Sequence, residues 1–167
     1  MAELTPQERL QPSLLDRLTD DEPDRQAESR EQRVLSPQRL RAALLRDLAW
    51  LLNTGHLETV AELEDHPQVK RSVLNYGIPD LTGLTLAGAD TARIEKAVRQ
   101  AIVDFEPRIA PESLRVSIET TEGAAARRAM VFRIEGALWA KPAPQALYLK
   151  TEVDLDTGDV RVNEGHG

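Results

Sequence analysis

The spacing of hydrophobic residues changes near residue 110 of this chain. Before that point apolar side chains recur every three to four residues, which is typical of amphipathic helices. After it they alternate with polar side chains, which is typical of strands with one buried face. Helices followed by strands predict an α+β fold, with helices packed on one face of a small antiparallel sheet of about four strands. An extended N-terminal arm precedes this domain.

The first two helices are predicted from their boundary residues. The first begins at Ser36-Pro37, because serine can cap free amides and proline fits the first helical position. It ends at Asn53-Thr54-Gly55, after leucines that recur on one face. A second helix is expected from Pro67 through Val73 to Tyr76-Gly77, where glycine can adopt the left-handed conformation.

The third predicted helix has the clearest apolar face and follows a capping candidate at Asp90. That face consists of Ile94, Ala97, Val98, Ala101, Ile102 and Phe105. Glu106 follows directly, and Pro107 forces a boundary because the residue before a proline favours extended geometry.

Four strands are predicted beyond this helix. Their apolar positions are Leu114, Val116 and Ile118; Met130, Phe132 and Ile134; Leu147, Leu149, Val153 and Leu155; and Val160 and Val162. Asp156-Thr157-Gly158-Asp159 is a hairpin turn that joins the last two strands.

Residues 1–35 are predicted to form a flexible arm, and residues 36–167 the folded domain. The arm carries nine acidic and five basic side chains with three prolines, and its apolar residues gather in segment 13–18. Leu14, Leu15 and Leu18 would share one side of a single helical turn, which cannot hold itself together in water. The turn must therefore dock, either on the domain's own core or in a partner's groove. The sequence leaves both alternatives open.

Composition narrows the class of protein. A content of 41% hydrophobic and 29% charged residues over 167 residues fits one globular domain. No apolar run is long enough to span a membrane and no leader precedes the domain, so a cytoplasmic protein is expected. The absence of cysteine fits a reducing compartment. A net charge of −7 with only short basic pairs argues against nucleic-acid binding.

No catalytic or metal site is predicted. The histidines His56, His66 and His166 are isolated, and no Gly-rich phosphate loop or nucleophile elbow is present. We therefore expect no metal and no cofactor. Glu106 is the only carboxylate in a distinctive setting, and Arg108 beside it would keep it ionised, which is the wrong state for a general acid.

Glu106, Pro107 and Arg108 form the candidate site. Proline fixes the backbone between two opposite charges, so a carboxylate and a guanidinium leave the helix end in a set direction. Such a pair suits recognition of a partner, but it can equally be a clasp within the domain. If it serves recognition, Arg108→Ala should leave the domain folded and abolish partner binding.

Several segments together resemble the TssE family of type VI secretion baseplate subunits, counterparts of the baseplate wedge protein of contractile-tailed phages. The segments are 13–18, 44–54, 72–81, 94–108 and 149–155. The resemblance implies a structural subunit that joins the wedge proteins TssF, TssG and TssK and acts as a template for the sheath proteins TssB and TssC. It places the protein at a baseplate docked on the inner face of the cytoplasmic membrane.

The same resemblance assigns partner binding to Glu106, Pro107 and Arg108, and less strongly to Leu14, Leu15 and Leu18. Some relatives are described as lysozyme-like, so peptidoglycan hydrolysis is the alternative from the enzyme class. A generic protein-interaction module is the other. A cytoplasmic chain has no access to the cell wall, which favours the structural role.

Overall fold

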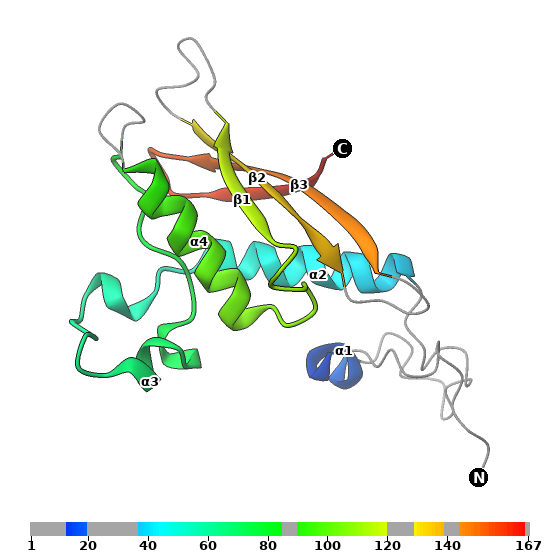
Figure 1. Ribbon diagram of the computed structural model, residues 1–167, viewed down its shortest axis with the longest axis horizontal. Helices are drawn as coiled ribbons and strands as arrows, with labels where there is room; N and C mark the ends of the chain where they lie inside the picture. Colours follow the sequence, from blue (N-terminus) through cyan, green and yellow to red (C-terminus); the bar gives the residue numbers. More distant parts are fainter. Residues whose placement is uncertain (1–12, 20–36, 85–89, 120–128, 139–143, 166–167) are drawn as a thin grey trace.

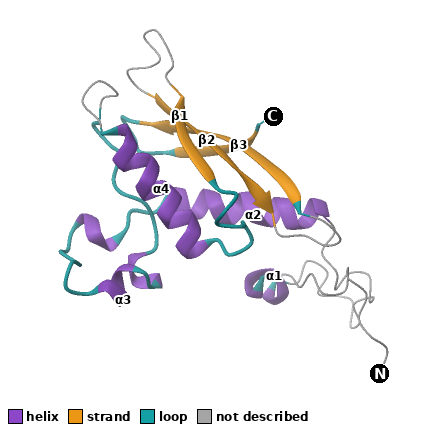
Figure 2. Ribbon diagram, viewed as in Figure 1, coloured by secondary structure: helices purple, strands orange, loops and turns teal. Residues whose placement is uncertain are grey.

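The computed structural model describes residues 13–19, 37–84, 90–119, 129–138 and 144–165 (Figure 1). Within these residues the predicted α+β fold is confirmed (Figure 2). The helices are α1 (Leu14–Leu18), α2 (Pro37–Leu52), α3 (Pro67–Lys70) and α4 (Thr91–Phe105), with the short 3-10 helices η2 (Leu57–Thr59) and η3 (Val73–Asn75). The strands are β1 (Arg115–Glu119), β2 (Ala129–Leu138), β3 (Gln145–Asp154) and β4 (Val160–Glu164).

The four strands form one antiparallel sheet in the order β1-β2-β3-β4. Ile134 in β2 pairs with Val116 of β1 on one side and with Leu149 of β3 on the other. Buried and exposed residues alternate along β3, because successive side chains point to opposite faces of a strand. One face of the sheet is therefore apolar and the other carries charged side chains such as Arg133 and Lys150.

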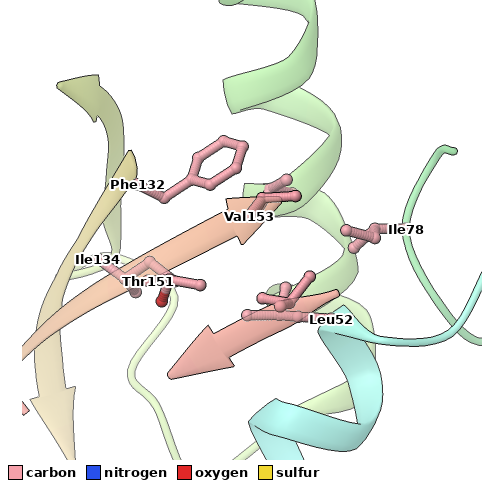
Figure 3. Close-up of a pocket in the computed structure, with 8 residues that line it drawn as sticks. Leu52, Ile78, Phe132, Ile134, Thr151 and Val153 are labelled. Atoms are coloured by element: carbon pink, nitrogen blue, oxygen red, sulfur yellow. The ribbon is translucent and has the colours of Figure 1, made fainter. Parts of the chain in front are cut away.

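The apolar face of the sheet packs against α2 and α4, and the core lies between these two layers (Figure 1). Leu44 and Leu48 of α2 and Ile102 of α4 are fully buried there. Asp90 caps α4 by accepting a hydrogen bond from the Arg93 amide at 3.1 Å, as its sequence predicts. Figure 3 shows the centre of this core, where apolar side chains surround Thr151 and leave no space for a water molecule.

The helix predicted from Pro67 to Tyr76-Gly77 is broken into α3 and η3. Ser72 interrupts it, because the Ser72 hydroxyl accepts a hydrogen bond from the Leu74 amide at 3.3 Å and starts a new turn. Asn75 is buried, and its side chain binds the Glu58 amide and the Lys70 carbonyl. The continuous helix was therefore a wrong prediction, although its two ends were placed correctly.

Gly77 makes the junction between this segment and the end of α2. Its φ is 129°, and a Cβ there would lie 2.2 Å from the Thr54 carbonyl oxygen. That carbonyl accepts a hydrogen bond from the Ile78 amide at 2.8 Å. Only glycine permits this close approach of two backbone segments.

Candidate partner-binding site

Glu106 ends α4 and is buried, with 4% of its surface exposed. Its carboxylate accepts three hydrogen bonds from Arg108: from the backbone amide at 3.1 Å, from Nε at 2.7 Å and from Nη2 at 2.5 Å. The side-chain pair is bidentate, which is the strongest geometry for an arginine and a carboxylate. Pro107 between them is exposed, so the turn points its proline ring outward.

Arg108 also reaches across to α2, where its Nη2 lies 2.6 Å from Asp47 Oδ2. Burial disfavours the charged form of Arg108, but Glu106 and Asp47 outweigh that effect and raise its pKa. The side chain keeps 21% of its surface exposed. Nη1 is buried and has no hydrogen-bond acceptor among the described residues.

Asp47 binds a second arginine with its other oxygen. Arg46 Nε donates to Asp47 Oδ1 at 2.9 Å, and Arg46 Nη1 donates to Asp16 Oδ1 at 2.7 Å. The Arg46 guanidinium also lies over the Trp50 ring, 5.1 Å from its centroid, because residues four apart share a face of α2. Five charged side chains therefore alternate in sign from the arm to the end of α4: Asp16, Arg46, Asp47, Arg108 and Glu106. We call these five residues the charged network.

The apolar residues beside the charged network hold the end of α4 in place. Tyr76 packs edge-on against Phe105 with ring centroids 5.2 Å apart. Burial, together with the negative charges of Asp47 and Glu106, raises the pKa of the Tyr76 hydroxyl. The segment that follows η3 therefore forms one wall of the site.

The predicted docking turn of the arm is helix α1, and it approaches the domain through Asp16. The three arm leucines remain exposed, at 70% for Leu14, 44% for Leu15 and 74% for Leu18. They do not fold back onto the core of the described residues. In the part of the chain that the structure describes, the leucines of α1 are therefore exposed and are not part of the core cluster.

Sequence reasoning singled out Glu106, Pro107 and Arg108 but missed Asp47, which pairs with Arg108, and Arg46, which pairs with Asp47. Asp47 lies 61 positions from Arg108, and no local pattern links the two. The available signal was two adjacent charges, Arg46 and Asp47, on a helix that is otherwise rich in leucine. Such a pair at the border of an apolar face often marks a fixed contact.

The basic pair Lys70 and Arg71 is engaged within the domain. Lys70 is paired with Glu58, and Arg71 lies 3.5 Å from Asp104. Arg127 and Arg128, the other basic pair, lie outside the described residues. Across the ranges that the structure describes, no group of three or more His, Asp or Glu side chains is placed to hold a metal ion. No helix in those ranges is long and apolar enough to cross a membrane.

Comparison with known families decides the assignment, since the profile of "baseplate wedge protein gp25" matches residues 38–143. The chain belongs to this baseplate wedge family. The predicted resemblance to baseplate wedge proteins is confirmed, and the family is a structural one. No curated protein and no solved structure matches the chain.

The matched region of this baseplate wedge protein contains α2, α4, β1 and β2. It therefore includes four residues of the charged network, Arg46, Asp47, Glu106 and Arg108. Asp16 and the strands β3 and β4 lie outside the match.

Proposed function

We propose that this baseplate wedge protein is the TssE subunit of a type VI secretion baseplate. It joins the wedge proteins TssF, TssG and TssK, with residues 36–167 as the wedge domain and residues 1–35 as the arm. It works in the cytoplasm, at a baseplate docked on the inner face of the cytoplasmic membrane. The observation that carries the proposal is a family match that includes the Glu106-Pro107-Arg108 turn.

The Glu106-Pro107-Arg108 turn is the proposed contact with the wedge partners. Buried Glu106 does not face a partner itself but fixes the Arg108 side chain, whose remaining exposed surface lies next to exposed Pro107. Arg108 Nη1 has no acceptor among the described residues, and a buried donor without an acceptor costs about 1–3 kcal/mol. A partner carbonyl or carboxylate would instead contact the part of the Arg108 side chain that remains exposed. In this proposal Glu106 holds the Arg108 side chain in position, and Arg108 contacts the wedge partner.

The two edges of the sheet differ, which bears on the proposed role as a template for the sheath. Side chains of α4 seal the outer edge of β1. Glu95 Oε1 accepts a hydrogen bond from the Ile118 amide at 2.8 Å, and Arg99 Nε donates to the Leu114 carbonyl at 3.1 Å. An edge that is covered in this way cannot pair with a strand from another chain.

Among the described residues, the outer edge of β4 is sealed at its start alone. There the Asn53 side chain accepts from the Val160 amide and donates to the Val160 carbonyl, each at 2.9 Å. Backbone groups two residues apart on a strand face the same edge, so those of Val162 also point away from β3. No described residue pairs with Val162 on that side. We propose that β4 pairs there with a strand of the sheath proteins TssB or TssC.

Co-purification from the host that encodes the chain tests the wedge assignment. A tagged full-length chain should recover TssF, TssG and TssK, identified by mass spectrometry of every bound protein. Recovery of unrelated proteins instead would contradict the assignment. Loss of turbidity of a peptidoglycan suspension with the purified chain, but not with Glu106→Gln, would overturn the structural role in favour of hydrolysis.

The edge of β4 is tested by Val162→Pro. Proline removes the outward amide of Val162 but no hydrogen bond to β3, and edge strands tolerate it. The variant should stay folded, recover the wedge proteins and fail to start TssB–TssC sheath assembly in a reconstituted baseplate. The matched control is Val116→Pro in β1, an edge already covered by α4, which should leave sheath assembly unchanged if the chain folds. Normal sheath assembly with Val162→Pro would contradict the proposed edge pairing.

A further inference from the structure

Helix α1 is a five-residue turn whose own contacts are local. Ser13 Oγ accepts from the Asp16 amide at 3.3 Å, and the Thr19 hydroxyl donates to the Leu15 carbonyl at 2.9 Å. A helix of one turn is unstable in water, because fixing its backbone costs more than its few hydrogen bonds return. Its position must therefore depend on a contact outside itself.

Among the described residues, that contact is the pair of Asp16 with Arg46. The two oxygens of Asp16 have different partners: Oδ2 accepts from the Ser13 hydroxyl at 2.6 Å, and Oδ1 accepts from Arg46 at 2.7 Å. One carboxylate thus joins the cap of α1 to the surface of α2. Arg46 is already fixed by Asp47 and by the Trp50 ring, so the anchor on the domain is preorganised.

The leucines of α1 lie on the side opposite the anchor. Successive helical residues are rotated by about 100°, so Leu14, Leu15 and Leu18 cluster on one side of the turn and Asp16 projects from the other. Their exposure of 44% to 74% agrees with this geometry. Docking through Asp16 therefore displays the apolar side instead of covering it.

We propose that Asp16 and Arg46 form a latch that positions the leucines of α1 beside Arg108, so that both engage one wedge partner through a single composite surface. Asp16 is a positioning residue in this scheme. The partner chemistry that fits is an apolar groove, which receives the leucines, flanked by a carboxylate that pairs with the exposed part of the Arg108 side chain. This inference rests on the wedge function proposed above.

The latch is weak enough to open and strong enough to affect binding. A partly exposed ion pair contributes up to about 1 kcal/mol, which corresponds to about a fivefold preference for the docked arm. Arg46 retains 36% of its side-chain surface exposed, so the pair belongs to this class. Removing the latch should weaken partner binding by at most about fivefold, whereas removing the leucines should weaken it further.

The latch itself is tested on the isolated full-length chain. Because the sequence contains no cysteine, Leu14→Cys provides a single site for a nitroxide label. The electron paramagnetic resonance spectrum should show a slow component that is reduced in Asp16→Asn and in Arg46→Gln. Glu112→Gln, which removes an exposed carboxylate elsewhere, is the matched control. An unchanged spectrum in Asp16→Asn would overturn the latch.

Coupling to the partner is tested with the purified TssF–TssG complex and the unlabelled chain. Asp16→Asn should weaken binding by up to about fivefold when Leu14 and Leu18 are present, and should have no further effect when both are changed to serine. An additive effect of Asp16→Asn would overturn the composite surface. If the unaltered chain does not bind TssF–TssG at all, the proposed wedge function fails, while the spin-label result still decides whether the latch exists.

Discussion

Arg108 Nη2 lies 2.6 Å from Asp47 Oδ2, which ties the turn after α4 to the middle of α2. The same guanidinium makes a bidentate contact with Glu106, so it is shared between two carboxylates. The site is consequently both a clasp within the domain and a fixed, partly exposed charge. The sequence left a clasp within the domain and recognition of a partner as alternatives. The structure shows the clasp, and recognition of a partner stays a prediction.

Arg108→Ala should destabilise the domain, contrary to the fold-neutral change that the sequence alone suggests. Glu106 would be left buried without its partner, and breaking a buried pair in this way costs about 3–5 kcal/mol. Urea denaturation measures the free energy of unfolding. Arg93→Ala, an exposed arginine of α4, is the control and should change it by less than about 0.5 kcal/mol. Equal stability of the two variants would mean that Glu106 is not held by Arg108.

Thr151→Val should stabilise the protein. Thr151 is 1% exposed, and its hydroxyl has no partner among the described residues in an apolar part of the core (Figure 3). Valine has the same shape without the unsatisfied hydroxyl, so the free energy of unfolding should rise by about 1–2 kcal/mol. Thr54→Val is the control. The Thr54 hydroxyl donates to the Trp50 carbonyl at 2.7 Å, so its removal should lower the free energy of unfolding. A fall in stability with Thr151→Val would indicate an acceptor for that hydroxyl.

Gly77→Ala should destabilise the domain by about 3 kcal/mol or more, because the new Cβ would lie 2.2 Å from the Thr54 carbonyl oxygen at a φ of 129°. Gly55→Ala is the matched control, since a Cβ at that position meets nothing within 4 Å. Thermal denaturation of the two variants separates the effects. Similar melting temperatures would show that the junction between α2 and η3 can relax.

Most of the fold could be predicted because its signals are local. The change of hydrophobic spacing gave the order of helices and strands, and the Asp156-Thr157-Gly158-Asp159 turn connects β3 to β4 as expected. The failure from Pro67 to Tyr76-Gly77 has a local cause as well. The Ser72 hydroxyl competes for a backbone amide, which the apolar spacing does not record.

The site was only half predictable. Pro107 and its two charged neighbours mark the turn in the sequence, but the partner Asp47 comes from α2 and depends on how α2 and α4 pack. Likewise, the leucines of segment 13–18 indicate a docking turn. The contact of this turn with Arg46 of α2 could not be predicted, because it depends on the folded surface. Contacts between distant charged residues leave no periodic signal in one sequence.

The docking of α1 should depend little on pH above the acidic range. Burial alone would raise the pKa of Asp16, but the hydrogen bonds from Ser13 and Arg46 lower it below its usual 3.8. A carboxyl whose pKa is lower in the docked arm than in the free arm stabilises docking at any pH above the pKa of the free arm. This stabilisation is lost as the pH falls through the pKa of the docked arm.

The slow component of a spin label at position 14 should therefore persist from about pH 8 to about pH 5 and disappear only below about pH 4. Added salt should reduce it at neutral pH, because the pair is partly exposed. Loss of the slow component between about pH 7 and about pH 6 would instead point to a histidine.

Recovery of TssF–TssG by the double variant Glu106→Gln/Arg108→Met separates recognition from folding. Replacing both members of a buried pair together is often nearly neutral for stability, so the double variant should lose less stability than Arg108→Ala. The measurement is affinity capture of TssF–TssG at a temperature well below the melting temperatures of both proteins. We predict that the folded double variant recovers far less TssF–TssG than the unaltered chain. Equal recovery would contradict this and would make Glu106-Pro107-Arg108 a clasp within the domain and nothing more.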